Sequence, residues 1–263
     1  MTLGIMGAMP EEVNSILQLM TQVEKITLGG REYCSGYIEQ QKVVLVFSRW
    51  GLVAAAATVT TLITRFNVTK VVFTGVAGAC ADQLNIGDIV VSEQLYQHNM
   101  DAEPLFPRHE IPLTGNTYIS ANPELIQQAH HAAHYAIEQL NTQLPQSVRE
   151  AFISQQPQCV KGTIASGDEF IADTNKTQRI LDAKPDTLAV EMEGAAVAAV
   201  CHDWQIPFVI VRIISDRANH DAHIDFPRFI SVIACHYAVH IITSLVTQMT
   251  AQQQDKPCAI DAN

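Results

Sequence analysis

The sequence predicts a single α/β domain, a three-layer αβα sandwich built around a central mixed sheet. Short apolar runs alternate along the 263-residue chain with longer amphipathic stretches, which is the pattern of strands followed by helices. Hydrophobic residues make up 48% of the composition and charged residues 16%, enough apolar material to bury a sizeable core. No internal repeat and no linker rich in Pro, Gly or Ser divides the chain. We therefore expect one domain over residues 1–249 and a polar, disordered tail over residues 250–263.

The first half of the chain predicts strand–helix units and an antiparallel pair. A strand is expected over residues 2–6 and a helix over residues 13–20, with Pro10 and Glu11 suited to the first helical turn. A turn is expected at 75–79, where glycines permit close approach of the backbone to a ligand. The remaining elements expected here are strands over 32–38, 42–48, 70–74 and 89–95 and a helix over 51–65.

The second half opens with a loop over residues 99–123, which contains Pro104, Pro107 and Pro112 and is long enough to be functional. Residues 141–157 are weakly patterned. Strands are expected over 160–165, 188–190 and 207–215, and helices over 123–140, 174–181, 191–202 and 226–249.

Charge and cysteine usage exclude several classes of protein. The formal net charge of −11 argues against binding to a nucleic-acid backbone, which needs clustered Lys and Arg. The six cysteines form no C-x-x-C pair and are expected to be free thiols in a reducing compartment. The N-terminus does not resemble a signal peptide, and no run of eighteen apolar residues predicts a membrane span. We expect a cytoplasmic protein that binds a small molecule.

Two acidic segments predict an enzyme. Glu191 and Glu193 stand among apolar residues and alanines, where an unpaired carboxylate costs several kcal/mol to bury. These carboxylates either point into a polar cavity or cap the helix that follows. Asp216 ends an apolar run, and acids at the carboxyl ends of buried strands lie where open α/β sheets bind ligands.

Other motifs are weaker. Residues 4–8 lack the spacing of a dinucleotide fingerprint, so no cofactor is expected. His130-His131-x-x-His134 and His220-x-x-His223 offer metal-ligand spacing, but the helical stretch is polar and we interpret it as solvated surface, with no metal. Serine hydrolysis is disfavoured because no G-x-S-x-G motif is present.

Taken together, the motifs resemble the 5'-methylthioadenosine/S-adenosylhomocysteine nucleosidase family of the nucleoside phosphorylase superfamily. The matching segments occur in the family's order over roughly residues 1–249. They are Gly4-Ile5-Met6-Gly7-Ala8-Met9-x-Glu11-Glu12, Leu28-Gly29-Gly30, Thr74-Gly75-Val76-Ala77-Gly78, Ile86-Gly87-Asp88-Ile89-Val90-Val91-Ser92, Ser166-Gly167-Asp168-x-Phe170-Ile171, Ala189-Val190-Glu191-Met192-Glu193 and Val211-Arg212-x-Ile214-Ser215-Asp216.

The resemblance implies a homodimer that hydrolyses the N-glycosidic bond of adenine nucleosides carrying a 5'-thio substituent. It implies that Glu12 takes the proton of the attacking water and that Asp216, oriented by Ser215, protonates adenine at N7. Glu193 would hold the ribose hydroxyls. Further contacts with the substrate are implied for Phe170, stacked on adenine, for the Ile171 backbone, for Met192 against the ribose, and for Met9, Trp50, Val76, Ala77, Glu191 and Phe226.

The chemistry agrees with these roles. The departing adenine must gain a proton, the water must lose one, and the sugar between them becomes positively charged. Two carboxyl groups in opposite protonation states supply both transfers, one of them with a raised pKa. A third anion near the ribose favours the developing charge.

The chain also departs from the family. Trp50 stands where a smaller aliphatic residue is usual near the 5'-substituent. Residues 99–115 match the usual loop less well, and residues 122–158 form a longer stretch than is typical. A hydrolase of the same fold acting on aminofutalosine therefore stays open as an alternative. A nucleoside phosphorylase is less favoured, because the first loop is acidic and only Arg49 and Arg212 are nearby cations. A nucleoside sensor without turnover is disfavoured by the presence of all three acids.

Overall fold

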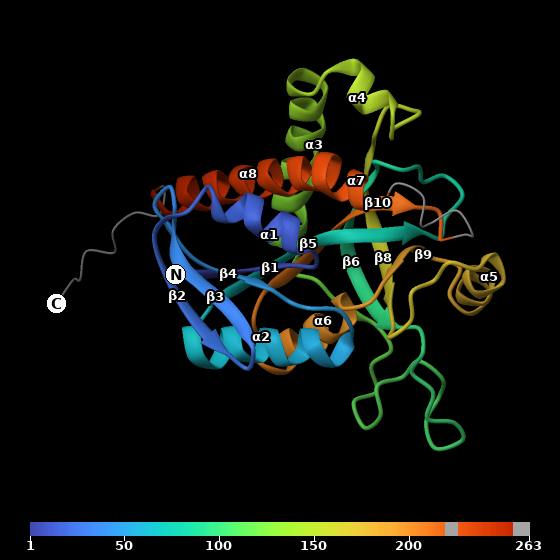
Figure 1. Cartoon of the computed structure of the whole chain (residues 1–263). Helices are drawn as coiled ribbons and strands as arrows, with labels where there is room; N and C mark the ends of the chain where they lie inside the picture. Colours follow the sequence, from blue (N-terminus) through green and yellow to red (C-terminus); the bar gives the residue numbers. More distant parts are fainter. Residues whose placement is uncertain (219–225, 255–263) are drawn as a thin grey trace.

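A computed structural model of the chain describes residues 1–218 and 226–254 and has one mixed sheet of ten strands (Figure 1). Helices cover both faces of this sheet, so the predicted αβα architecture with a mixed sheet is confirmed. One face carries α1 (Pro10–Leu17) and α8 (Cys235–Gln254), and the other carries α2 (Leu52–Phe66) and α6 (Gly194–Asp203).

The sheet closes on itself at one end. Its strands are β1 (Thr2–Gly7), β2 (Thr21–Leu28), β3 (Arg31–Ile38), β4 (Gln41–Phe47), β5 (Lys70–Ala79), β6 (Ile89–Gln97), β7 (Ile119–Ser120), β8 (Cys159–Ser166), β9 (Thr187–Glu191) and β10 (Phe208–Asp216). They follow the order β2-β3-β4-β1-β5-β9-β8-β6-β10, with β7 beside β6, and β10 returns to pair with β5. The last five strands of that order therefore form a ring.

Strand register places the ends of this ring close together. Gly78 of β5 pairs with Asp216 of β10 on one side and with Val190 of β9 on the other. Ser166, the last residue of β8, pairs with Glu191, the last residue of β9. The acidic residues that the sequence places at strand ends are thus brought to one region by the pairing of the strands.

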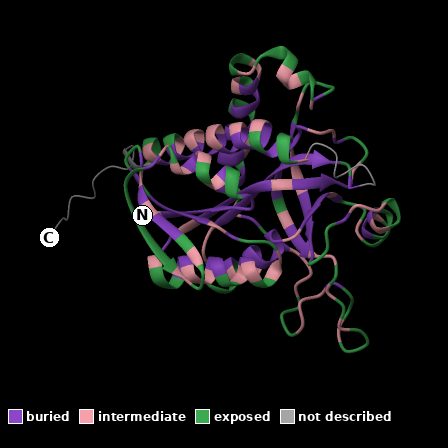
Figure 2. Ribbon diagram, viewed as in Figure 1, coloured by how far each residue is buried: buried purple, intermediate pink, exposed green. Residues whose placement is uncertain are grey.

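The central strands are buried on both sides (Figure 2), and the buried residues around them are mostly apolar. The run Val71-Val72-Phe73 of β5 and the run Val209-Ile210-Val211 of β10 have no exposed surface. Continuous apolar runs of this kind are typical of parallel strands covered by helices on both faces.

Two predictions for the first half of the chain need correction. Residues 75–79 are not a turn but the second half of β5, since small residues let this strand pass close to its neighbours. A Cβ at Gly75 would lie 2.7 Å from Cβ of Ala8, and one at Gly78 would lie 2.9 Å from a carboxylate oxygen of Asp216. Strand β2 was not predicted, because it is almost wholly exposed and carries no alternation of apolar and polar residues.

In the second half the predicted helices are found as α3 (Pro123–Gln143), α5 (Thr174–Ala183) and α6. Helix α6 begins at Gly194, so Glu191 belongs to the preceding strand rather than to the helix predicted for residues 191–202. A short helix, α4 (Gln146–Glu150), lies in the weakly patterned stretch.

The predicted closing helix is divided by a wider turn. It comprises α7 (Phe226–Phe229), a π-helical turn over Ile230–Ala234, and α8, which continues to Gln254 in the stretch predicted as tail. The stretch Phe226–Gln252 is apolar and long enough to cross a membrane, but 61% of its most apolar window is buried in the protein. The apolar side chains of this helix are therefore mostly packed into the core of the protein. His220, His223, Cys258 and residues 255–263 lie outside the described residues.

Candidate active site

A cavity of about 390 Å³ opens at the strand ends, a volume suited to a small ligand such as a nucleoside. Every site residue predicted from the sequence lines it except Glu12. The lining comes from the segments after β1, β4, β8 and β9, from β5 and β10, and from α7, and includes Met9, Trp50, Val76, Ala77, Phe170, Ile171, Glu191, Met192, Glu193, Ser215, Asp216 and Phe226. Ala8, Gly78, Glu169 and Val190 also line it and were not singled out, although each adjoins a predicted residue in the sequence.

Asp216 is held in one orientation at the end of β10. Its Oδ2 accepts a hydrogen bond from Oγ of Ser215 at 2.8 Å, and its Oδ1 accepts one from the backbone N–H of Ala218 at 2.8 Å. The Ser215 hydroxyl also lies 3.4 Å from the carbonyl oxygen of Ala77. Asp216 is only 6% exposed, so its side chain borders the cavity from a buried position.

Glu12 lies in the first turn of α1 and has no exposed surface. Across residues 1–218 and 226–254, neither of its carboxylate oxygens has a hydrogen-bond partner of ordinary geometry. Burial raises the pKa of Glu12 to about 8, while the charge of Arg212 and the backbone of Met9 oppose this rise. The carboxyl group is therefore largely protonated at neutral pH. As the pH approaches 8 it ionises to a carboxylate, which can accept a proton.

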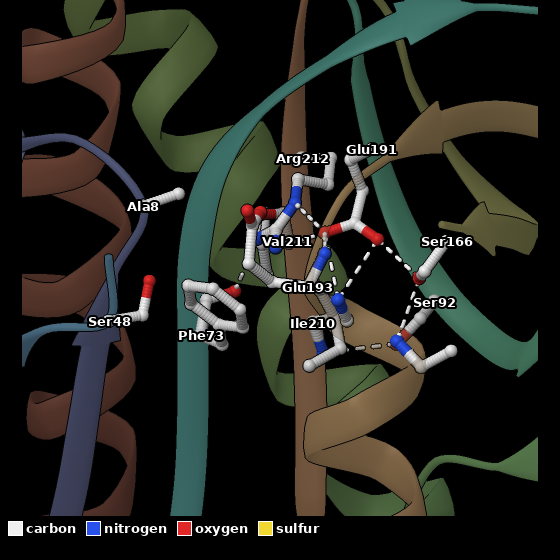
Figure 3. A network of polar contacts seen from close by, with 12 residues as sticks. Ala8, Ser48, Phe73, Ser92, Ser166, Glu191, Glu193, Ile210, Val211 and Arg212 are labelled. Atoms are coloured by element: carbon white, nitrogen blue, oxygen red, sulfur yellow. Dashed lines mark hydrogen bonds and ion pairs between the residues drawn. The ribbon is translucent and has the colours of Figure 1, made fainter. Parts of the chain in front are cut away.

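The carboxylate of Glu191 is hydrogen-bonded to other groups of the protein, as Figure 3 shows. Its carboxylate accepts hydrogen bonds from Arg212 at 2.6 and 3.2 Å and from the backbone N–H of Gly194 at 2.9 Å. The hydroxyl of Ser166 donates a further hydrogen bond to it and accepts one from the N–H of Ala195 at 2.7 Å. Of the alternatives left open by the sequence, Glu191 takes the helix-capping one.

The sequence placed Arg212 near this site as a cation but did not reveal it as the partner of Glu191. Its side chain is fully buried, forms an ion pair with Glu191 and lies over the ring of Phe73 at 4.1 Å from the centroid. An arginine inside the apolar run Phe208–Ile214 of a buried strand was the available signal, because a buried guanidinium needs a carboxylate partner.

Glu193 takes the other alternative and borders the cavity. Its Oε1 accepts a hydrogen bond from the N–H of Gly51 at 2.8 Å, and its own N–H donates to Glu191 at 3.1 Å. Burial and the nearby charge of Glu191 raise the pKa of Glu193 to about 7, and Arg212 opposes the rise. Gly51 has a φ of 93°, a left-handed conformation that favours glycine at this contact.

Aromatic side chains border the cavity where it meets solvent. Phe170 is 47% exposed and Trp50 is 61% exposed, although both belong to the lining. Nε1 of Trp50 donates a hydrogen bond to the carbonyl oxygen of Ala8 at 2.9 Å, which fixes the indole beside the first loop. Large flat side chains with a satisfied polar end suit the binding of planar or apolar ligand groups.

The described lining contains no Lys, Arg or His. Arg212 is occupied by Glu191, and Arg49 donates to the carbonyl oxygen of Gly30. The described lining residues therefore offer no cluster of cations for a phosphate, and no His or Cys for a soft metal ion.

Comparison with known proteins agrees with this geometry. The profile of the phosphorylase superfamily matches residues 2–246. A 5'-methylthioadenosine/S-adenosylhomocysteine nucleosidase from Shewanella denitrificans is 36% identical over 95% of this chain and 100% of its own length.

Solved structures are similar as well. An S-adenosylhomocysteine nucleosidase from Streptococcus pyogenes, in complex with 5-methylthiotubericidin, has a TM-score of 0.81 at 30% identity and covers 95% of this chain and 97% of its own. A futalosine hydrolase from Helicobacter pylori has a TM-score of 0.80 at 31% identity, covering 94% and 97%. This chain therefore belongs to the phosphorylase superfamily and, within it, to the N-glycosyl hydrolases of the 5'-methylthioadenosine/S-adenosylhomocysteine nucleosidase family.

Proposed function

We propose that this chain hydrolyses the N-glycosidic bond of 5'-methylthioadenosine and S-adenosylhomocysteine and releases adenine. The observation that carries the proposal is a pair of carboxyl groups in contrasting environments. Glu12 is sealed from solvent with its pKa raised, whereas Asp216 borders the cavity with both oxygens hydrogen-bonded. Carboxyl groups in different environments divide the acid and base roles of glycosidic-bond hydrolysis, and because the pKa of Glu12 is raised, it must lose its proton before it can act as the base.

Asp216 is the proposed general acid. It delivers a proton to N7 of adenine while the bond between N9 and C1' of the ribose breaks, and the bonding electron pair leaves with the base. The hydrogen bond from Ser215 supports this role because it holds the carboxyl group in a fixed direction. Phe170 is the proposed stacking partner of adenine, and the backbone of Ile171 is proposed to read its edge.

Glu12 is the proposed general base. Water attacks C1' as the glycosidic bond breaks, and Glu12 accepts the water proton. The products are adenine and the free thio-substituted ribose. Glu12 has gained one proton and Asp216 has lost one, so a net transfer of one proton from Glu12 to Asp216 restores the pair. Glu193 is the proposed ligand of the ribose hydroxyls, with Met192 against the sugar, and its charge favours the cation-like transition state.

Aminofutalosine hydrolysis is the second candidate. The Helicobacter pylori futalosine hydrolase is as similar to this chain in structure as the nucleosidases are, with a TM-score of 0.80. The proposed catalytic acids serve either substrate, so the 5' side of the cavity, where Trp50 lies, has to discriminate between them.

We also propose that the protein is a cytoplasmic homodimer. Several large apolar side chains are strongly exposed, among them Val53 at 80%, Leu105 at 82% and Leu113 at 89%. All five cysteines of the described chain are free and buried, as suits a reducing compartment. Light scattering on a size-exclusion column tests the assembly, and a monomer mass at micromolar concentration would contradict it.

The function is tested by measuring adenine release from methylthioadenosine, S-adenosylhomocysteine and aminofutalosine under the same conditions. We expect kcat/KM for one of the thio-nucleosides to exceed that for aminofutalosine by at least about tenfold, the scale of a pocket contact. The reverse order would favour the second candidate. Release of adenine from none of the three would overturn the assignment as a nucleosidase.

A further inference from the structure

A second cluster of reactive side chains lies outside the cavity, where α3 packs against β8. His130 and His134 are one helical turn apart on α3, and Cys159 is the first residue of β8. The potential ligand atoms of the three side chains all lie within 4.8 Å of one another. The sequence revealed the histidine pair but not the thiol, because Cys159 is separated from them by a weakly patterned stretch.

The arrangement of the histidines suits coordination. Their ring centroids are 4.6 Å apart and the ring planes meet at 77°, so the two imidazoles are not stacked face to face. The backbone of Cys159 lies close to the ring of His130. A backbone carbonyl that accepts from one ring nitrogen leaves the other nitrogen as a lone-pair donor, which is the usual outer contact of a metal-binding histidine.

Burial differs among the three side chains in a way that leaves one side open. Cys159 is only 9% exposed, His130 is half-buried and His134 is exposed. Two imidazoles and a thiolate are ligands that zinc prefers, whereas magnesium and calcium prefer oxygen. Zinc is commonly four-coordinate, and the exposed side leaves room for a water molecule.

We propose that His130, His134 and Cys159 bind a zinc ion, with water as the fourth ligand, and that the ion ties α3 to β8. Binding replaces the thiol proton of Cys159, which passes to solvent. Lys161 lies near both Cys159 and His130, where its charge favours the thiolate but repels the dication.

The zinc site and the active site lie at opposite ends of β8. Cys159 starts this strand and Ser166, which contacts Glu191, ends it, a separation of about 23 Å for an extended strand. The proposal is therefore independent of the proposed substrate, and variants in the cluster leave adenine release unchanged.

Titration of the tag-free, chelator-treated protein with Co²⁺, followed by displacement with Zn²⁺, tests the proposal. We expect one equivalent of Co²⁺ to give the absorption bands of a tetrahedral site, including a thiolate-to-cobalt charge-transfer band. Cys159→Ser removes that band, and His134→Gln weakens zinc binding by at least about 10–100-fold, the loss seen when outer contacts alone are removed. Zn²⁺ also raises the melting temperature of the wild type but not of Cys159→Ser.

Matched controls come from the same helix and from another buried thiol. His131→Gln, next to His130 and exposed, and Cys34→Ser, buried in β3, retain the wild-type bands and zinc affinity. His134 is exposed, so its variant reports on binding even where replacing Cys159 disturbs folding.

Several results would overturn the proposal. One is the absence of a thiolate band in the wild type, and another is a band that survives Cys159→Ser. A third is loss of binding on replacing His236 and His240, a neighbouring pair on α8 with ring centroids 4.4 Å apart, while the proposed ligands are intact.

Discussion

Asp216 combines a fixed orientation with a position on the cavity, and a single atom replacement isolates its proton. Asp216→Asn keeps the size of the side chain but cannot donate as an acid. We expect kcat to fall by about 10²–10⁴-fold while methylthioadenosine still binds, as measured by adenine release and by calorimetry. Asp203→Asn, an exposed position at the end of α6, serves as the control. Retention of half the wild-type activity by Asp216→Asn would contradict the acid role.

Glu12 offers a test in which rate and stability respond in opposite directions. Its pKa is about 8 in the folded protein and near 4.5 when unfolded, so the folded state binds the proton more tightly. Between these pH values the unfolded chain ionises first, and stability falls as the pH rises. Above pH 8 the loss of folding stability caused by the buried Glu12 carboxylate is constant, and below pH 4.5 this loss is absent.

Glu12→Gln removes this cost because glutamine does not ionise. We expect the variant to be nearly inactive, yet more stable than the wild type at pH 8, with the difference shrinking toward zero near pH 4.5. Melting temperatures across that range measure the stability. In the wild type, kcat/KM should rise with pH toward the pKa of about 8, since the base must be ionised. If Glu12→Gln kept the wild-type rate of adenine release, Glu12 would only be a charge that stabilises the N-terminus of α1 and not the general base.

Trp50 tests the 5' side of the cavity. The indole is held to Ala8 and borders the cavity, and we propose that its bulk narrows the space for a long homocysteine tail. Trp50→Ile is expected to raise kcat/KM for S-adenosylhomocysteine relative to methylthioadenosine by about tenfold or more, because such contacts contribute about 1–3 kcal/mol. Trp204→Ile, exposed beyond the end of α6, controls for loss of an aromatic ring. An unchanged ratio would exclude Trp50 from discrimination.

At the scale of elements, the start of α6 depends on the buried pair of Glu191 and Arg212. Arg212→Met leaves the Glu191 carboxylate buried and unpaired, so we expect a loss of about 3–5 kcal/mol in the free energy of unfolding by urea. The second change Glu191→Gln should recover part of this loss, because it removes the unpaired charge. Arg179→Met on the exposed face of α5 is the control, expected within about 0.5 kcal/mol of the wild type.

The same substitution has an electrostatic consequence at a distance. The Arg212 charge lowers the pKa of both Glu12 and Glu193, so its removal raises both. The rising limb of the pH–rate profile should therefore move to higher pH in Arg212→Met. A limb that stays in place would show that Arg212 acts through packing alone.

At the scale of the whole molecule, the charge of the cavity predicts a hydrolase rather than a phosphorylase. The described lining carries acids and no Lys, Arg or His, so a phosphate dianion beside C1' would be repelled. We expect phosphate to leave the rate unchanged relative to chloride at equal ionic strength, and the sugar product to be free thio-substituted ribose. Detection of a ribose 1-phosphate by mass spectrometry would contradict the hydrolase.

Much of this architecture follows from local sequence. Alternating apolar runs predicted the strands and helices, because burial on both faces requires continuous apolar segments such as Phe208–Val211. The positions of Glu193 and Asp216 at strand ends predicted where a cavity would form, since ends of neighbouring strands meet. Strand β2 escaped this reasoning because its exposed residues leave no periodic signal.

Only the tertiary structure decided what each acidic residue does. Glu191 and Glu193 both line the cavity, yet the carboxylate of Glu191 is held by Arg212 and the start of α6, whereas that of Glu193 accepts a hydrogen bond from Gly51. The burial of Glu12 and the approach of Cys159 to the histidines of α3 were equally hidden. The physical reason is that periodicity reports which face of an element is buried, whereas the pKa and partners of a charged group depend on strand register and packing between distant segments.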